Sequence, residues 1–423
     1  MKHYYKRIAD DILIDKLESK GAVLIQGAKW CGKTTTASRI AGSIINMQDP
    51  ARKNQYLKMA ELDPSILLEG ETPRLIDEWQ LAPQLWDAVR FEVDKRDEFR
   101  QFILTGSAVP LADMTKSHSG TGRISRMLMR PMTLYESGDS NGTVSLRELF
   151  KEQNEIVSRS DIDIRKGAFL ICRGGWPKAI GQSGKIALRQ AYDYYDAVVE
   201  SDISDADGVG RNHQRVMLLM RSYARNISSD VKMSVIREDM VSNDLDSLNV
   251  DTIYSYINAL KGIFVIEDMP AWSPNLRSRT AIRTSDTRHF VDPSIAVAAL
   301  GIGPDDLLHD LNTFGLLFES MCVRDLRVFA EALDGSVYHY RDKTGLECDA
   351  VIHLRNGSYA LIEVKLGGDK AIDEASENLI RLRGKIDIDK MQAPAFMMVL
   401  TCTEFAYRRE DGVYVVPIGC LKN

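Results

Sequence analysis

The segment from Gly27 to Thr34 holds the residue types best suited to bind phosphate. It reads Gly-Ala-Lys-Trp-Cys-Gly-Lys-Thr and fits the pattern G-x-x-x-x-G-K-[ST]. The apolar run 22–26 before it predicts a strand, and the run 34–41 after it predicts a helix. A loop in that setting presents backbone N–H groups and the positive end of a helix to phosphate oxygens. We therefore expect a nucleotide to contact Gly27, Ala28, Lys29, Trp30, Cys31, Gly32, Lys33, Thr34 and Thr35.

Two side chains of this loop have distinct expected roles. Lys33 can reach the β- and γ-phosphates and is a predicted catalytic residue, and the Thr34 hydroxyl can ligate Mg²⁺. No N-K-x-D motif, which would specify guanine, stands where one is expected. The predicted cofactors are therefore ATP and Mg²⁺. The alternative is a chance match in a turn that contains glycine.

Two acids, Asp77 and Glu78, directly follow the apolar run 74–76. Ligands of open α/β sheets bind at the carboxyl ends of the strands, so Asp77 is expected in the Mg²⁺ shell. Glu78 is expected to position or deprotonate the attacking water. Many strands end in solvated acids, but an acidic pair downstream of a P-loop favours the catalytic interpretation.

Further polar and cationic residues follow the next predicted strand, 101–105. Thr105 and Ser107 could each lie beside the γ-phosphate, and Ser107 is taken as a nucleotide contact. An ordinary strand-to-loop turn is the alternative. Arg123 is the predicted catalytic arginine, acting within its own chain or on a neighbouring copy, and Arg130 is a weaker choice. An ordinary surface arginine is the alternative for Arg123.

Another group of chemically suited residues lies near the end of the sequence. Asp349, Glu363 and Lys365 have the spacing Asp-x13-Glu-x-Lys of the PD-(D/E)xK nucleases. In that chemistry two carboxylates bind Mg²⁺, and the lysine steadies the attacking water or the phosphate. The register of the hairpin decides whether the acids meet. A three-residue loop at 355–357 sets Asp349 opposite Glu363, whereas a two-residue turn separates the acids.

Glu319 could supply a third acid from the amphipathic helix predicted at 316–326. Glu319, Asp349 and Glu363 are therefore predicted metal ligands, and Asp349, Glu363 and Lys365 are predicted catalytic residues. The alternative is a nuclease-like fold that serves only as a scaffold and carries an ordinary Glu–Lys surface pair.

The elements that must position these residues indicate an α/β chain. We expect a P-loop NTPase parallel sheet, then a mostly helical winged-helix-like region, then a small α/β nuclease-like domain. A length of 423 residues suits two or three domains. The segment 138–145 is rich in Ser, Gly and Asp, so the expected domains are 1–140, 141–305 and 306–423.

The middle region has a pattern that could contact DNA. Helices are predicted over 189–225 and 250–260, followed by a strand at 264–266 and a hairpin at 270–290. Such an order resembles a winged helix, with a basic hairpin for phosphates. The arginines concerned are Arg211, Arg215 and Arg225 on a helix face and Arg277, Arg279, Arg283 and Arg288 on the hairpin. The alternative is a packing or protein-interaction module.

Composition excludes several classes of protein. The formal net charge is −6, so the chain as a whole is not a basic nucleic-acid binder. The six cysteines are scattered without a CxxC pair, which argues against a disulfide framework or zinc site and for a reducing cytoplasm. No apolar run approaches the roughly 18 residues that span a bilayer. The start of the sequence lacks the apolar core of a signal peptide.

An ordered set of motifs resembles a prokaryotic AAA-type P-loop ATPase family with a C-terminal domain of unknown function. The motifs are the P-loop, Leu75–Gln80, Leu104–Ser107, Gly122–Ile124, Arg130–Glu136, Gly174–Pro177, Glu200–Ile203, Leu317–Glu319, Glu347–Asp349 and Ile362–Lys365. The resemblance spans essentially the whole chain. Trp30 and Cys31 stand where that family has smaller or polar residues, and Ser320 replaces its usual Asn.

These observations lead to three hypotheses about function. The first is an ATP-binding protein, a slow Mg-dependent ATPase that acts as a conformational switch coupled to DNA or a protein partner. The second is an ATP-regulated, metal-dependent DNA nuclease. The third is a non-catalytic module that docks DNA or protein. The expected partners are ATP, double-stranded DNA and a protein, with no membrane, and an arginine supplied by a neighbour would require oligomerisation.

Overall fold

The computed structural model describes residues 4–107, 121–152, 154–205, 208–241, 249–274, 285–387 and 391–423. These residues form two compact units, which we describe separately. The first comprises Met1–Pro131, Glu200–Arg211 and Ile257–Val265, and the second comprises Met132–Val199, Asn212–Tyr256 and Ile266–Asn423. The division into domains 1–140, 141–305 and 306–423 stays a prediction.

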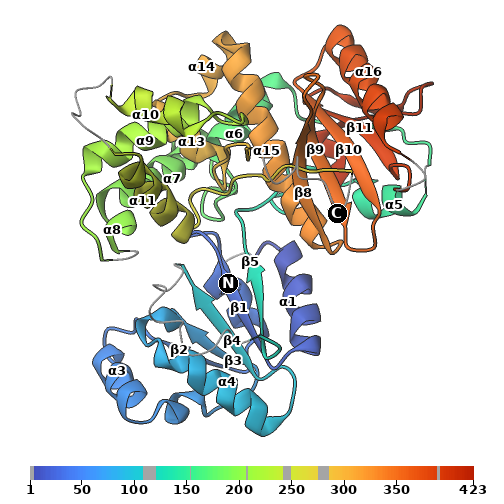
Figure 1. The fold of residues 1–423 in the computed structure, drawn as a ribbon. Coiled ribbons are helices and arrows are strands. Elements are labelled where there is room, and N and C mark those ends of the chain that lie inside the picture. Colours follow the sequence, from blue (N-terminus) through green and yellow to red (C-terminus); the bar gives the residue numbers. More distant parts are fainter. Residues whose placement is uncertain are drawn as a thin grey trace. The chain divides into compact units, whose positions relative to one another are not determined.

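The first unit is built on a five-stranded parallel sheet (Figure 1). Across the sheet the strands are β2 (Ser43–Asn46), β3 (Arg74–Asp77), β4 (Phe102–Gly106), β1 (Ala22–Gln26) and β5 (Ile124–Leu128). All four pairings are parallel. Sheets covered on both faces have strands that are apolar throughout, which is why the run 22–26 already predicted a buried strand. The predicted parallel sheet is confirmed.

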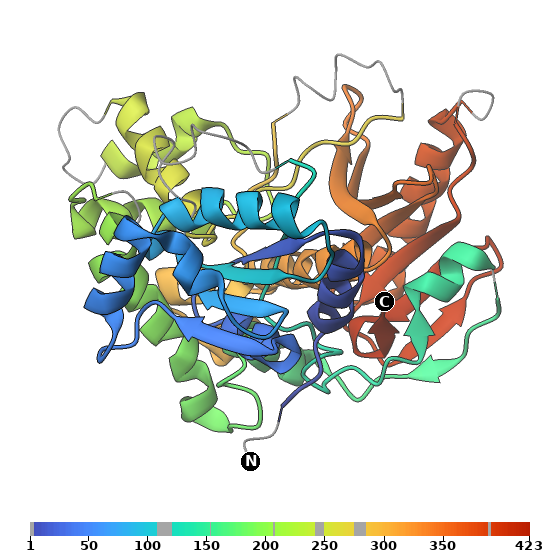
Figure 2. The same cartoon turned by 90° about the horizontal axis from the view of Figure 1, so that it is seen from below.

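Helices cover both faces of this sheet (Figure 2). One face carries α1 (Ile8–Ser19) and α2 (Lys33–Ile40), and the other carries α3 (Lys53–Leu62) and α4 (Gln84–Arg96). Successive residues of a strand point to opposite faces. Val23 accordingly packs with α1 and α2, whereas Leu24 packs with α3 and α4. Burial on both sides therefore fixes the position of the loop that follows β1.

The second unit begins with a helical region. Its helices are α5 (Leu146–Lys151), α6 (Ile164–Arg173), α7 (Gly184–Ala197), α9 (His213–Arg225), α10 (Met233–Val241), α13 (Pro293–Leu300) and α14 (Pro304–His309). The sequence continues from α7 through a π-helical turn (Val198–Asp202) into α8 (Ile203–Asp205). Part of this stretch, Glu200–Arg211, belongs to the first unit. Helix α11 (Val250–Gly262) confirms the helix predicted at 250–260.

Two expectations for this region are wrong. The predicted strand at 264–266 does not form, because Phe264 has a left-handed backbone (φ 59°) and only Ile266 makes an isolated bridge, to Phe290. Arg211 does not share a helix face with Arg215, because α9 begins at His213. Arg211 is instead buried and donates to the Ile203 carbonyl at 2.8 Å.

The second unit ends in a seven-stranded mixed sheet (Figure 1). Its order is β7 (Ser158–Arg159), β12 (Phe405–Arg408), β13 (Tyr414–Pro417), β11 (Phe396–Thr401), β10 (Tyr359–Lys365), β9 (Glu347–Leu354) and β8 (Gly335–Arg341). A separate pair joins β6 (Val144–Ser145) to β14 (Leu421–Lys422). Helices α15 (Leu311–Glu331) and α16 (Asp369–Lys385) pack against the large sheet. The structure is therefore α/β overall, with a small sheet domain at the carboxyl end.

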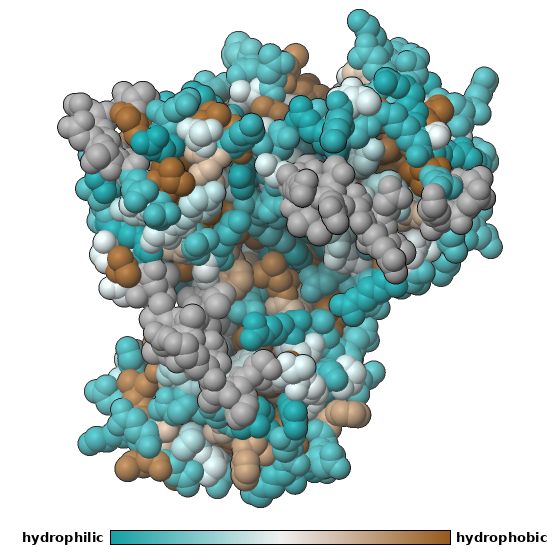
Figure 3. All heavy atoms as spheres, in the orientation of Figure 1, coloured by the Kyte–Doolittle hydropathy of each residue, from teal (hydrophilic) through white to brown (hydrophobic). Residues whose placement is uncertain are grey.

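The surface of the described residues is mainly polar. Figure 3 shows hydrophilic side chains over most of the face drawn. Exposed hydrophobic residues of the first unit include Leu62, Phe91 and Phe99. Among the residues that the structure describes, no helix has both the length and the apolar character needed to cross a membrane.

Candidate functional site

The P-loop connects β1 to α2 through an unusual backbone. Gly27 and Gly32 adopt positive φ angles of 148° and 109°, a region that glycine enters readily. A Cβ atom at Gly27 would lie 2.1 Å from the Met129 carbonyl oxygen, so the loop packs closely on the residue after β5. Cys31 Sγ donates to the same carbonyl at 3.3 Å. The buried cysteine of the motif therefore fastens the loop to Met129.

Trp30 and Lys33 of the loop lie in different environments. Trp30 is 44% exposed and has a left-handed backbone (φ 66°). Lys33 is buried, and its Nζ donates to the carbonyls of Gly27 and Ala28 at 2.8 Å each. The loop's own carbonyls thus hold the lysine over the phosphate-binding backbone.

The Asp77 side chain at the end of β3 is hydrogen-bonded to both the neighbouring strand β4 and the P-loop helix α2. Its Oδ1 accepts a hydrogen bond from Thr34 Oγ1 at 2.8 Å and another from Thr105 Oγ1 at 2.5 Å. The register pairs Asp77 with Thr105, at the carboxyl ends of β3 and β4. Mg²⁺ prefers oxygen ligands such as these. The Asp77 carboxylate and the Thr34 hydroxyl therefore fit the metal that the sequence implies.

Glu78 turns sharply away from the strand. Its backbone is left-handed (φ 58°, ψ 47°), a conformation that is strained for a residue with a side chain. Its Oε2 accepts hydrogen bonds from Gln80 Nε2 and from Ser107 Oγ, the latter at 3.4 Å. The structure thus brings Ser107 to Glu78 and Thr105 to Asp77. Sequence reasoning weighed Thr105, but it named Gln80 only as the last residue of the motif Leu75–Gln80 and gave its side chain no role.

Lys29 makes a long-range ion pair that sequence reasoning missed. Its Nζ lies 2.6 Å from Oδ1 of Asp202, a residue that is 9% exposed and ends the π-helical turn Val198–Asp202. Both residues belong to the first unit. The motif Glu200–Ile203 was noticed only as part of the family resemblance, and the contact gives it a place beside the P-loop.

Arg123 lies at the other end of the sheet from the P-loop. Its carbonyl accepts from the N–H of Ala22, the first residue of β1, whereas the P-loop follows the last residue of that strand. A five-residue strand is about 16 Å long. The guanidinium pairs with Asp94 at 2.7 Å on the surface. The expected role of Arg123 within its own chain is therefore corrected to a surface ion pair, and action on a neighbouring copy stays a prediction.

The second candidate site lies on the hairpin of β9 and β10. The register pairs Ala350 with Ile362, so its next step sets Asp349 opposite Glu363. The connection is the three-residue loop 355–357, with Gly357 at φ 91°. A register shift opposite Tyr338 and Tyr340 indicates an extra residue in β9 between Cys348 and Val351. Such bulges re-aim side chains. Of the two alternatives for this connection, the three-residue loop is therefore confirmed and the two-residue turn is not.

Lys365 occupies the space between the two acids of this hairpin. Its Nζ lies 2.8 Å from Glu363 Oε2 and 3.2 Å from Asp349 Oδ2, and the latter oxygen also accepts from the Val364 N–H at 2.7 Å. Burial, reinforced by Asp349, raises the pKa of Glu363 to about 8. Burial alone would lower the pKa of Lys365, but the two carboxylates outweigh it and raise that pKa. The lysine is thus held as a cation among carboxylates.

Glu319 of α15 completes this group. Burial and then the neighbouring Asp349 raise its pKa well above the usual range. Glu319 and Asp349 line a cavity of about 220 Å³ together with His339, Arg341 and Glu347. Arg341 is engaged by Asp230 at 2.8 Å and by Glu347 at 3.2 Å. The structure therefore gathers Glu319, Asp349, Glu363 and Lys365 as the sequence predicted.

The structure brings these carboxylates together but does not arrange them around a metal ion. Among the described residues, no group of three or more His, Cys, Asp or Glu is arranged to hold a metal ion. The reason at this hairpin is Lys365, whose ammonium lies between Asp349 and Glu363. Metal binding by Glu319, Asp349 and Glu363 would require the lysine to move aside.

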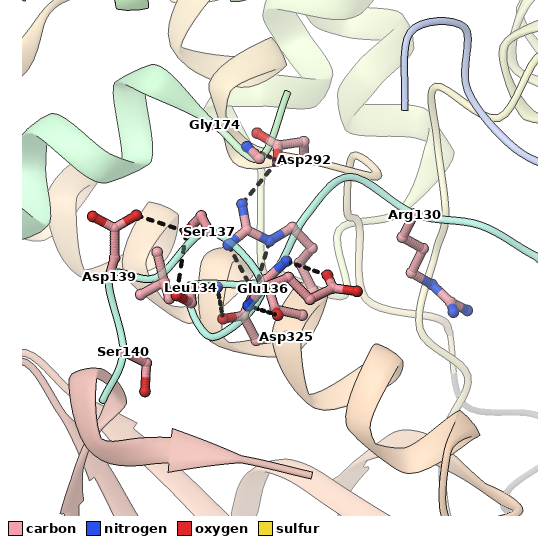
Figure 4. A network of polar contacts seen from close by, with 12 residues as sticks. Arg130, Leu134, Glu136, Ser137, Asp139, Ser140, Gly174, Asp292 and Asp325 are labelled. Carbon is pink, nitrogen blue, oxygen red and sulfur yellow. Dashed lines mark hydrogen bonds and ion pairs between the residues drawn. The ribbon is translucent and has the colours of Figure 1, made fainter. Parts of the chain in front are cut away.

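A buried ionic network fixes α15, the helix that carries Glu319 (Figure 4). Arg324 pairs with Asp292 at 2.9 Å and with Asp325 at 2.7 Å, and all three side chains are at most 1% exposed. Asp325 accepts from the Leu134 N–H, and Asp292 accepts from the Gly175 N–H, both at 2.9 Å. The motifs Arg130–Glu136 and Gly174–Pro177 thus provide backbone donors to a network centred on α15.

The basic residues expected to contact DNA are only partly accounted for. Arg277, Arg279 and Arg283 lie outside the described residues. Arg288 pairs with Asp268 at 3.0 Å, and Arg225 pairs with Asp239 at 3.0 Å. Met269 and Thr287 form an isolated antiparallel bridge, and the hairpin expected at 270–290 stays a prediction because residues 275–284 lie outside the described part of the chain.

Three family comparisons match successive parts of the sequence. Residues 19–137 match the family described as AAA domain. Residues 165–306 match a domain of unknown function (DUF8612), and residues 314–421 match another (DUF4143). The first match contains the P-loop, Asp77, Glu78 and Ser107, and the last contains Glu319, Asp349, Glu363 and Lys365.

Curated relatives and solved structures resemble the chain at lower identity. Uncharacterized proteins Mb2031c of Mycobacterium bovis and Rv2008c of Mycobacterium tuberculosis are each 22% identical over 363 residues, which is 85% of this chain and 73% of theirs. The Walker-type ATPase PABY2304 of Pyrococcus abyssi is 16% identical, with a TM-score of 0.44, over 70% of this chain and 96% of that one. The Aeropyrum pernix ORC1 protein in complex with DNA is 12% identical, with a TM-score of 0.22, over 74% of this chain and 95% of that one.

The sequence matches and the observed parallel sheet agree on the nature of the first unit. The P-loop, the acid at the end of β3 and the strand order belong to the stretch that matches the AAA family. The chain therefore combines an AAA-type P-loop ATPase domain with a C-terminal domain of unknown function.

Proposed function

We propose that this chain binds ATP and hydrolyses it slowly with Mg²⁺, as a conformational switch coupled to DNA or to a protein partner. The observation that carries this proposal is the Asp77 carboxylate, which is shared by the hydroxyls of Thr34 and Thr105 beside the buried Lys33. A carboxylate, a hydroxyl and a P-loop lysine at one point are the parts that phosphoryl transfer requires.

Each residue has a defined task in the proposed reaction. The backbone of residues 27–35 cradles the phosphates, and Lys33 leaves its loop carbonyls to contact the β- and γ-oxygens. Thr34 and Asp77 hold Mg²⁺, which when bound neutralises charge on the phosphates. Glu78 takes a proton from the attacking water. Ser107, which donates to Glu78, lies where a side chain can respond to the γ-phosphate.

The path of the chain supports a switch. The Met129 carbonyl accepts one hydrogen bond from the P-loop cysteine, and the N–H of Leu134, five residues later, donates to Asp325 on α15. The same helix carries Glu319. A movement of the P-loop on nucleotide binding would pull on this short link, and we propose that it changes how the C-terminal domain meets its partner.

Phosphate release from ATP tests the hydrolytic proposal. We expect release by the native protein that is lost in Lys33→Ala, because the lysine's contacts to the phosphates cannot be replaced by a methyl group. Lys58→Ala, an exposed change on α3, is the matched control. Stimulation by double-stranded DNA would favour DNA as partner. Equal release by the native protein and Lys33→Ala would contradict the proposal.

A second function is favoured by the C-terminal cluster. We propose, as the alternative, that Asp349, Glu363 and Lys365 form a metal-dependent DNA nuclease site, with Glu319 as a further ligand. Support comes from the hairpin register and from the cavity beside Asp349 and Glu319. Cleavage of DNA with Mg²⁺ or Mn²⁺ that is lost in Asp349→Asn, but not in the exposed control Glu374→Gln, would establish it. Metal-independent cleavage, or cleavage retained in Asp349→Asn, would contradict it.

The remaining alternative is a docking module without chemistry at either site. It predicts that DNA or a protein partner binds equally well to the native protein and to Lys33→Ala. A cytoplasmic location is part of the main proposal and is supported by six cysteines that are all buried and free of disulfides.

A further inference from the structure

Gln80 holds the acid that is proposed to activate water. Its Nε2 donates to Oε2 of Glu78, two residues earlier in the chain. Both residues belong to the tight turn after β3, in which Glu78 is left-handed and Trp79–Leu81 form a short 3₁₀ helix. The turn therefore places an amide directly against the carboxylate.

The orientation of this amide follows from chemistry. An ionised carboxylate only accepts hydrogen bonds, so the NH₂ end of Gln80 must face Glu78. Its Oε1 then points away and is buried without a hydrogen-bond partner among the described residues. A buried acceptor without a partner is unfavourable and calls for a functional explanation.

The neighbouring strand is shaped to receive the same side chain. A Cβ atom at Gly106, between Thr105 and Ser107, would lie 2.9 Å from Gln80 Oε1 and 3.2 Å from Trp79 Nε1. Any larger residue there would displace the amide. The fold thus keeps Gln80 against Glu78 at the expense of an unpaired acceptor, a strained backbone and a glycine in β4.

We propose that Gln80 is a positioning residue for ATP hydrolysis, which aims the Glu78 carboxylate at the attacking water. The inference rests on the proposed ATPase function and deepens it. As the water oxygen bonds to the γ-phosphorus, the bond from phosphorus to the ADP oxygen breaks, and Glu78 accepts the proton of the water. Gln80 occupies Oε2, so that the other carboxylate oxygen of Glu78 takes this proton.

Steady-state hydrolysis by Gln80→Met is the primary test. Methionine has a similar length but cannot donate, so we expect kcat to fall about 10- to 50-fold. This is less than the roughly 10²–10⁴-fold that general acid–base catalysis contributes, because Gln80 acts only through Glu78. We expect KM for ATP to change less than about twofold, because Gln80 contacts Glu78 and not the P-loop. Gln84→Met, an exposed change on α4, is the control and should match the native protein.

Two further readouts separate positioning from a merely structural role. In the Glu78→Gln background, Gln80→Met should cause no further loss of kcat, because residues that act as a unit are not additive. The thermal midpoint of Gln80→Met should be equal to or higher than that of the native protein, since the substitution removes a buried unpaired acceptor. Gln80→Glu should be at least as inactive as Gln80→Met, because its carboxylate repels Glu78.

The outcomes distinguish this inference from the function on which it rests. A normal kcat in Gln80→Met, or losses that add in the double variant, would overturn the positioning role while leaving the ATPase in place. A lowered thermal midpoint with a raised KM would also overturn it in favour of a structural role. Absence of Lys33-dependent hydrolysis in the native protein would overturn the proposed function and this inference together.

Discussion

At the scale of single residues, Asp77 carries the most tightly defined chemistry of the first unit. Two hydroxyls from different elements, those of Thr34 and Thr105, converge on one of its oxygens. The sequence predicted Asp77 and Thr34 from the order of motifs. It took Ser107 and not Thr105 as the nucleotide contact, and it could not place either hydroxyl, because their positions depend on the pairing of β3 with β4 and on the turn at Glu78.

Thr105→Val tests the hydroxyl that Asp77 shares. Valine has nearly the same shape, so the fold should persist, but Asp77 loses a buried donor. We expect phosphate release to fall about 10-fold, as for a lost hydrogen bond to a charged group of about 1.5–3 kcal/mol. ATP binding should change little. Unaltered release at saturating Mg²⁺ would show that Thr105 only packs against the strand.

Lys365→Met tests the charge balance of the C-terminal cluster. Removing the lysine leaves the carboxyl groups of Asp349 and Glu363 without the cation that lies between them. We expect the free energy of unfolding to fall by about 3–5 kcal/mol above about pH 8, where Glu363 is ionised and loses its buried partner, and by less at lower pH. The double variant Lys365→Met with Glu363→Gln should recover part of that loss. Urea unfolding measures both, and a single variant as stable as the native protein would contradict this view of Lys365.

At the scale of elements, much of the architecture follows from local sequence, and the long-range contacts do not. The strand 22–26 and the helix 250–260 were predictable from apolar period and capping, whereas the sequence left a three-residue loop and a two-residue turn open at 355–357. The bulge in β9 and the contact of Lys29 with Asp202 were not predictable, because they depend on residues distant in sequence. The strand expected at 264–266 failed for a related reason, since the left-handed backbone of Phe264 has no local signal.

Asp202→Asn tests the element that contacts the P-loop. The Asp202 carboxylate lies at Lys29, so it places a negative charge close to the loop that must receive phosphates. Removing that charge should tighten ATP binding severalfold, with a smaller effect at high salt because screening weakens the repulsion. Equilibrium binding of a fluorescent ATP analogue measures it.

The control for this change is Asp11→Asn on α1, whose partner Lys6 is exposed. Weaker ATP binding in Asp202→Asn would indicate that the ion pair instead holds the loop in its binding conformation. Equal changes in ATP binding by both variants would show that the effect comes from the net charge of the protein and not from the ion pair with Lys29.

At the scale of the whole molecule, α15 connects the main observations of the second unit. It bears Glu319, the Arg324–Asp325 pair and Ser320, whose hydroxyl lies 3.3 Å from His289 Nδ1. His289 is fully buried, and its Nε2 lies 3.2 Å from the Thr287 hydroxyl. Burial, and then the neighbouring Arg327 and His339, lower its pKa well below the usual value.

His289 predicts how stability depends on pH. A histidine whose folded pKa is depressed stays neutral in the folded protein, whereas the unfolded chain takes up a proton below about pH 6.5. The stabilisation is therefore present above that pH and is lost at up to about 1.4 kcal/mol per pH unit as the pH falls. Urea unfolding of the native protein and His289→Gln between pH 7.5 and 5.5 measures it. A slope that is unchanged in the variant would contradict the assignment.

The measurement that tests the central claim most directly is phosphate release as a function of Mg²⁺ concentration, in the native protein and in Asp77→Asn. Asparagine keeps the shape of the side chain but removes the charge that would hold the metal. The account predicts Mg²⁺-dependent release by the native protein, and in Asp77→Asn a rate at least 10-fold lower with a higher Mg²⁺ requirement. Identical Mg²⁺ curves for the two proteins would contradict it.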